Sequence, residues 1–111
     1  MADVSAYPEI IKRVIQEYAG FKPSLGEVEV ETVFADAQGH YELVYSGWHD
    51  FRRIHGVVIH VDIRGDKVWI QHDGTEDGIA GELMEAGIPQ ERIVLAWHHP
   101  HKRPFTGFAV G

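Results

Sequence analysis

A β-hairpin pattern in the middle of the chain restricts the possible folds more than any other feature of the sequence. Residues 54–63 are rich in valine and isoleucine, a composition typical of a strand. Gly65 and Asp66 separate this run from a second one, KVWIQH, at 67–72. Two such runs joined by two residues predict a tight antiparallel hairpin.

Side chains alternate along these two strands and so separate an apolar face from a polar one. We expect His60 and Asp62 on the polar face, whereas His72 points to the other face. Only a bulge in one strand would change this arrangement. The expected cross-strand pairs are Arg64 with Lys67, Ile63 with Val68, Asp62 with Trp69, Val61 with Ile70 and His60 with Gln71.

Helical and strand periodicities on either side of the hairpin form one continuous series of short elements. Apolar residues recur at intervals of three and four near the N-terminus and again after Gly78, as on one side of a helix. Gly20 followed by Pro23 is expected to end the first helix, and Gly39 to complete a tight turn in DAQG. The expected elements are a helix over 5–19, strands over 27–36, 40–48, 54–63 and 67–72, a helix between 78 and 87, and a strand over 93–97.

This order of elements predicts an α+β fold. An N-terminal helix precedes a four-stranded antiparallel meander, which a second helix and a C-terminal strand follow. The strands cluster as hairpins, so a doubly wound parallel sheet is not expected. We therefore expect two layers, with helices packed on a sheet.

The composition excludes several classes of site and location. At 111 residues, with 44% apolar and 24% charged residues, the chain is expected to form a single domain over residues 1–111. It contains no cysteine, which excludes disulfides, thiolate nucleophiles and Cys-ligated metal sites. No apolar run is long enough to span a bilayer or to serve as a signal peptide, so we expect a cytoplasmic protein without membrane contact.

The stretch QHDGTEDGIA at 71–80 concentrates ionisable side chains and could either bind a metal or begin a helix. Asp73 and Glu76 have the spacing of a capping box, and Thr75 is an alternative cap. A metal site would need ligands from the neighbouring strand to converge with His72 or Asp73, and the strand alternation opposes that. The sequence therefore favours helix initiation, and it indicates no catalytic residue, no metal and no cofactor.

A metal-dependent enzyme or a small-ligand pocket nevertheless stays an alternative. Adjacent histidines in an extended chain diverge, and no carboxylate stands at the helical spacing found in H-E-x-x-H motifs. The His-rich stretch HHPHKRPFTGF at 98–108 is therefore more typical of a solvated loop. The residues that could build such a site are His60, Asp62, Gln71, His98, His99 and His101.

Basic and aromatic residues are interleaved in two places, around the middle of the chain and near its C-terminus. Tryptophan and arginine are enriched at protein interfaces, so this pattern predicts a partner-binding surface. Direct DNA binding through the same residues is the alternative, although the net charge of −7 opposes it. The mixed Asp62–Trp69 face also allows a homo-oligomer. The predicted partner-binding residues are Trp48, Arg52, Arg53, His55, Trp97, His99, His101, Arg103 and Phe105.

Several sequence blocks resemble the XisI family, small proteins named as controlling factors for excision of the fdxN DNA element in cyanobacteria. The most specific blocks are WIQHDGTEDGIA at 69–80 and RPFTGFAV at 103–110. The similarity runs from about Tyr7 to the C-terminus and rests on the blocks YPEIIKRVIQEYAGFKPS, HYELVYSGW, RRIHGVVIHVDI, KVWIQHDGTEDGIAGELMEAGIP and IVLAWHHPHKRPFTGFAV.

The resemblance implies an accessory role in site-specific excision. XisI-like proteins accompany XisH, which resembles a nuclease-fold protein, beside a recombinase that exchanges the strands. The resemblance therefore implies an XisH-like partner, with DNA reached through the complex. It assigns no catalytic residue to any position of this chain.

Overall fold

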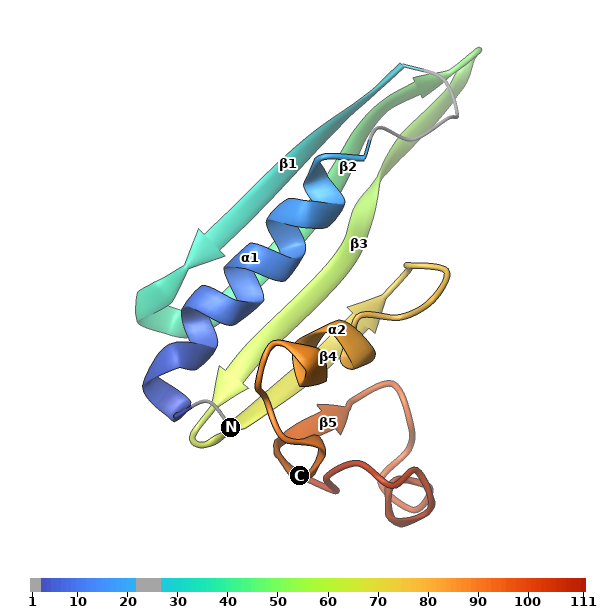
Figure 1. The fold of residues 1–111 in the computed structure, drawn as a ribbon. Helices are drawn as coiled ribbons and strands as arrows, with labels where there is room; N and C mark the ends of the chain where they lie inside the picture. The colour runs from blue at the N-terminus through green and yellow to red at the C-terminus, as the bar shows by residue number, and fades with distance from the viewer. Residues whose placement is uncertain (1–2, 22–26) are drawn as a thin grey trace.

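The computed structural model describes residues 3–21 and 27–111, which form helices on one side of a sheet (Figure 1). Pro23, expected to help end the first helix, lies outside these residues. The helices and strands are α1 (Tyr7–Ala19), β1 (Glu27–Ala35), β2 (His40–His49), β3 (Arg52–Arg64), β4 (Lys67–Asp73), α2 (Ala80–Glu85) and β5 (Ile93–Leu95). Short 3-10 turns lie at Val4–Ala6, Asp36–Gln38, Gln90–Arg92 and Arg103–Phe105.

The sheet has five strands in the order β1-β2-β3-β4-β5, which confirms the predicted α+β fold. β1 to β4 form the antiparallel meander expected from the sequence, whereas β5 pairs with β4 in parallel. The parallel pairing is possible because α2 and the loop after it return the chain to the start of β4. The sheet is therefore mixed, with one parallel edge.

Helix α1 supplies much of the hydrophobic core through one apolar stripe. Ile11 and Ile15 have no exposed surface, and Val14 is 3% exposed. They pack against sheet residues that alternate with polar ones, among them Tyr41 and Val61. The helix begins at Tyr7 instead of Ser5, because Asp3 caps a 3-10 turn at Val4–Ala6 that precedes it.

Two bulges interrupt the pairing of β3 with its neighbours. The register shifts between Leu43 and Val44 against β2, and between His60 and Val61 against β4. The second bulge makes the predicted pair of His60 with Gln71 wrong, since His60 lies opposite His72. The other four predicted pairs of this hairpin are present. The alternation rule fails here because an extra residue in one strand breaks the period of two.

The start of α2 differs from the predicted capping box. Asp73 accepts hydrogen bonds from the backbone N–H of Thr75 at 3.0 Å and of Ile79 at 2.8 Å, and from the Thr75 hydroxyl. Helix α2 begins only at Ala80, and Glu76 lies exposed before it. The aspartate therefore does fix the helix start, as expected, but it does so through an Asx-type turn and a longer-range bond.

The C-terminal strand is shorter than expected. β5 ends at Leu95, and the N–H of Ala96 donates to the carbonyl of Ile70 at 3.0 Å before the chain turns. Trp97, predicted to end the strand, lies half exposed in this turn. Within the described residues, no helix is long and apolar enough to cross a membrane.

A polar cluster of Lys12, Asp36 and Tyr41, which we call the Asp36 cluster, joins α1 to the turn between β1 and β2. Lys12 Nζ lies 3.0 Å from Asp36 Oδ2, and the buried Tyr41 hydroxyl donates to Asp36 Oδ1 at 2.9 Å. Gly39 follows in the left-handed region at φ 60°, where a side chain would lie 2.9 Å from the carbonyl oxygen of Ile63. The predicted tight turn is thus present and anchored on both sides.

We expect the Asp36 cluster to make the free energy of unfolding fall as the pH rises through the alkaline range. Burial, and then Asp36, raise the pKa of Tyr41 to about 12, whereas an unfolded tyrosine titrates near 10. Between these values the unfolded chain loses a proton that the folded chain keeps, so the free energy of unfolding falls by up to about 1.4 kcal/mol per pH unit. The pKa of Lys12 is raised by Asp36 and Glu9, so its contribution also declines as the pH rises.

Urea unfolding between pH 9 and 12 measures this slope. Tyr41→Phe is expected to make it shallower, because the variant has no hydroxyl to keep protonated. Tyr45→Phe is the matched control, since it leaves the bond between Tyr41 and Asp36 intact. Equal slopes for the wild-type chain and Tyr41→Phe would contradict the prediction.

Candidate functional site

The predicted partner-binding residues in the middle of the chain lie at the tip of the β2–β3 hairpin. We call Trp48, Phe51, Arg52, Arg53 and His55 the hairpin-tip surface. Phe51 is fully exposed at the turn, and Trp48 is 49% exposed beside it. Asp50 closes the turn at φ 53°. Strand β3 begins at Arg52 and not at Ile54 as predicted. Arg52, Arg53 and His55 therefore belong to a strand and not to a loop.

Arg53 holds the tryptophan of this surface in place. Its guanidinium lies over the Trp48 ring, 5.3 Å from the ring centroid, and donates to the Gly47 carbonyl at 3.3 Å and the Ser46 hydroxyl at 3.2 Å. Trp48 and Arg53 are also directly opposite in the strand register. The hairpin-tip surface is therefore built on paired strands and has a fixed aromatic component.

The predicted C-terminal residues lie in the segment 96–111, in which Arg103 has a structural role. Its guanidinium donates to the carbonyls of His98 at 2.9 Å, Ala96 at 3.1 Å and Val110 at 3.4 Å. It also lies 5.3 Å from the centroid of the Trp69 ring. These contacts occupy Arg103 within its own chain, so it is poorly placed to bind a partner.

The other predicted residues of this segment are exposed. Phe105 is 87% exposed and Trp97 is half exposed. The rings of His99 and His101 meet edge to face, with their centroids 4.8 Å apart. Trp69, on the face expected to be mixed, lies against two guanidinium groups, with its ring centroid 4.8 Å from that of Arg64 and 5.3 Å from that of Arg103.

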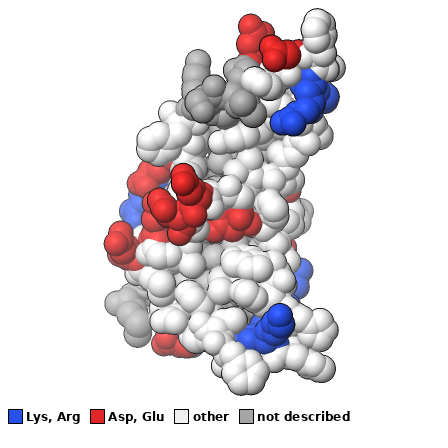
Figure 2. All heavy atoms as spheres, turned by 90° about the vertical axis from the view of Figure 1, so that its right-hand side faces the viewer, with Lys and Arg blue, Asp and Glu red and all other residues white. Residues whose placement is uncertain are grey.

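The two groups of partner-binding residues do not form one surface. The molecule measures 43 Å along its longest axis, and the hairpin tip and the C-terminal segment lie at opposite ends of it (Figure 1). Figure 2 shows the face that lies at the right-hand side of Figure 1. The larger basic areas of this face lie near its upper and lower ends, and acidic side chains gather at mid-height. The two groups are therefore separate candidate surfaces, one at each end of the molecule.

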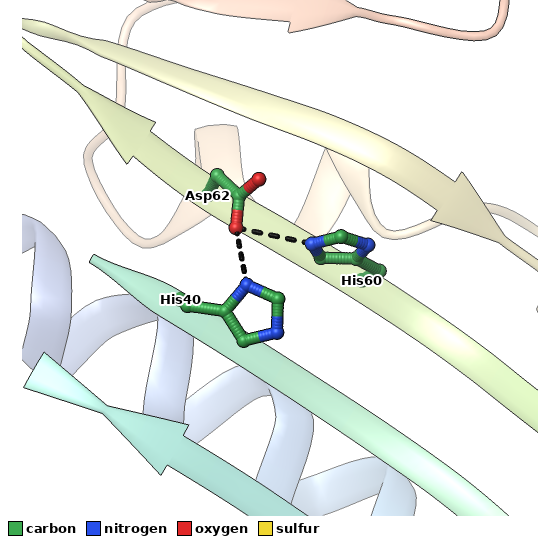
Figure 3. Close-up of side chains that lie close together, drawn as sticks. All are labelled: His40, His60 and Asp62. Atoms are coloured by element: carbon green, nitrogen blue, oxygen red, sulfur yellow. Dashed lines mark hydrogen bonds and ion pairs between the residues drawn. The ribbon is translucent and has the colours of Figure 1, made fainter. Parts of the chain in front are cut away.

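A polar cluster on the sheet joins His60 and Asp62, which the sequence predicts on one face, to a third residue, His40. His40, His60 and Asp62, which we call the His–Asp cluster, place their potential ligand atoms within 4.8 Å of one another (Figure 3). Asp62 Oδ1 lies 2.9 Å from His40 Nδ1 and 3.0 Å from His60 Nε2. All three side chains are half-buried on the sheet face opposite α1.

Neighbouring side chains fix this cluster. His40 Nε2 lies 3.0 Å from Glu42 Oε2, and the amide of Gln71 donates to Asp62 Oδ2 at 3.3 Å. The hydrogen bond with Glu42 raises the pKa of His40 above its ordinary value, burial opposes this, and the charges of Asp62 and Glu42 add to it. The cluster thus has two carboxylates, two imidazoles and one amide in contact.

His40 was missing from the candidate residues derived from the sequence. It lies on β2, directly opposite Asp62, and Glu42 lies directly opposite His60. A register for the β2–β3 pair, counted outward from the hairpin tip, could have indicated this, but the bulge at Val58 shifts that count by one residue. Among the described residues, His98, His99 and His101 do not form a group with three ligand atoms close together.

Comparisons with known proteins give one consistent answer. A family model described as XisI protein matches residues 1–110. A XisI-like protein from Anabaena variabilis is 35% identical, and its crystal structure superimposes with a TM-score of 0.90 over 98% of this chain and 100% of that chain. The fdxN element excision controlling factor XisI from the same organism is 31% identical, with a TM-score of 0.84 over 97% of this chain and 98% of that one. No curated protein sequence matches the chain.

Proposed function

Because this chain belongs to the XisI family, we propose that it is a non-enzymatic accessory factor for excision of a DNA element and acts by binding a partner protein. The Anabaena variabilis protein with 31% sequence identity is an fdxN element excision controlling factor, and the two chains cover one another almost completely. This similarity supports the same kind of role here. The family resemblance implies an XisH-like protein as the partner.

The hairpin-tip surface is the observation on which this proposal rests. Phe51 is fully exposed, and Trp48 is half exposed under the guanidinium of Arg53. Exposed large aromatics beside arginine are typical of residues that dominate binding energy, because they bury much apolar area and pair with carboxylates at once. Strand pairing holds them before the partner arrives, which reduces the entropy lost on binding.

Charge reversal at the hairpin tip tests this surface. We expect Arg53→Glu to weaken the complex with the XisH-like partner by about 30-fold or more, the effect of losing an interface residue worth at least about 2 kcal/mol. The variant loses the cation–π contact with Trp48 and replaces the positive charge of the proposed surface with a negative one. Co-purification followed by calorimetric titration of the two proteins gives the affinity.

Lys102→Glu is the matched control. It makes the same change in charge at the opposite end of the molecule, where Lys102 is exposed. We expect it to leave the affinity unchanged. If Lys102→Glu and Phe105→Ala weaken the complex and Arg53→Glu does not, the C-terminal segment is the binding surface. If changes at both ends leave the affinity unchanged, the hairpin-tip surface does not bind the partner.

Direct DNA binding is a second candidate, because the same tip combines two arginines with exposed rings on which bases could stack. The separated basic areas and the net charge of −7 oppose it. A gel shift with the chain alone at low salt distinguishes the two functions. Binding to DNA would weaken steeply with salt, because each phosphate contact releases counterions.

A further inference from the structure

We propose that His40, His60 and Asp62 bind a divalent transition-metal ion, with Zn²⁺ as the test ion. The proposal is independent of the excision role, since it concerns the sheet face and neither end of the molecule. Two imidazoles and one carboxylate are the donors of three-ligand zinc sites, which keep a further position open.

The strand register fixes the positions of the four side chains around the site. His40 and Asp62 are directly opposite across β2 and β3, and Glu42 and His60 form the next pair on the same face. Directly opposite residues have Cβ atoms about 5 Å apart, and residues two apart on a strand share a face. The main-chain pairing of the sheet therefore brings these groups together in the folded protein before any ligand binds.

The distances are close to those that an ion requires. Asp62 Oδ1 lies 2.9 Å from His40 Nδ1 and 3.0 Å from His60 Nε2. Zinc bonds of about 2.1 Å separate neighbouring ligand atoms in a tetrahedral site by about 3.4 Å. Movements of about half an ångström by half-buried side chains would admit the ion.

In its neutral form, His40 directs a lone pair at one of the two carboxylates that flank its ring. A neutral imidazole has one N–H and one acceptor nitrogen, yet both ring nitrogens of His40 face carboxylate oxygens. If Nε2–H donates to Glu42, Nδ1 presents its lone pair beside Asp62 Oδ1. A cation between them removes this repulsion. A carboxylate that holds the outer nitrogen of a ligating histidine is also the usual arrangement around zinc.

Side chains around Asp62 orient its free oxygen. Gln71 donates to Oδ2 at 3.3 Å, and Arg64 Nη2 lies 3.7 Å from the same atom. Both contacts leave Oδ1 directed at the two imidazoles. Arg64 adds one positive charge near the site, which Glu42 balances at the other side. The carboxylates and the arginine together leave one net negative charge to attract the ion.

Metal binding to the full chain, purified without a histidine tag, tests the proposal. Elemental analysis after dialysis against Zn²⁺ is expected to find one equivalent per chain, and Co²⁺ is expected to give visible absorption typical of a low-coordinate nitrogen and oxygen site. Asp62→Asn and His40→Gln are expected to abolish both. Glu42→Gln keeps the three ligands and is expected to weaken binding by 10–100-fold, as other outer-shell changes do.

The double variant His99→Ala/His101→Ala is the matched control, because it removes two neighbouring histidines outside the His–Asp cluster. We expect it to keep the equivalent of Zn²⁺. Loss of binding in this variant, or an unchanged equivalent in Asp62→Asn, would assign the ion to another site.

Circular dichroism shows which variants are folded. If Asp62→Asn is unfolded, the histidine NMR signals of the wild-type chain decide: Zn²⁺ must shift those of His40 and His60. Wild-type chain that takes up no Zn²⁺ or Co²⁺ at pH 7.5 overturns the proposal.

Discussion

Truncation of Ile59 to alanine is expected to lower the free energy of unfolding by about 2–5 kcal/mol. Ile59 has no exposed surface and lies in the core between Leu43 on β2 and Asp73 on β4. It lies on β3 between the two register shifts. The loss combines the transfer of three methyl or methylene groups to water with the cavity that they leave.

Val57→Ala is the control for this change. Val57 lies on the same strand, on the opposite face, and is 38% exposed. We expect a loss below about 1 kcal/mol, within the range of strand propensities. Urea unfolding of both variants gives the comparison. Equal losses would mean that Ile59 is not part of the rigid core.

Replacement of Asp73 by alanine is expected to lower the free energy of unfolding by about 2–3 kcal/mol. One carboxylate accepts hydrogen bonds from two backbone N–H groups and one hydroxyl, and the variant leaves these donors without their partner. Hydrogen bonds to charged groups contribute about 1.5–3 kcal/mol, and unsatisfied donors add a cost of their own. Ile79, whose N–H is one of the three donors, is fully buried beside α2.

Glu76→Ala separates this network from the capping box expected from the sequence. Glu76 is exposed and precedes the helix, so we expect a change within about 0.5 kcal/mol. Asp73→Asn should fall between the two, since an amide oxygen still accepts a hydrogen bond. A large loss in Glu76→Ala with little in Asp73→Ala would restore the capping box. Hydrogen exchange at Ile79 reports the change directly.

The functional residues were harder to derive than the elements that hold them. The hairpin-tip residues were identified from composition, and exposure at the tip is consistent with partner binding. The prediction joined them to the C-terminal segment because both are basic and aromatic, and chain composition contains no information about distance. Arg103 illustrates the same difficulty, since its contacts with three carbonyls depend on how residues 96–110 fold back.

Local sequence patterns predict the α+β class, the four-stranded meander and both helices, because side-chain periodicity and turn residues act over a few neighbours. Tertiary structure alone decided the parallel edge at β5, the separation of the two basic ends and the His–Asp cluster. The cluster depends on β2 and β3 pairing across a bulge, so that His40 meets Asp62. Periodicity describes one strand at a time, whereas register is set by the packing of whole strands against the core.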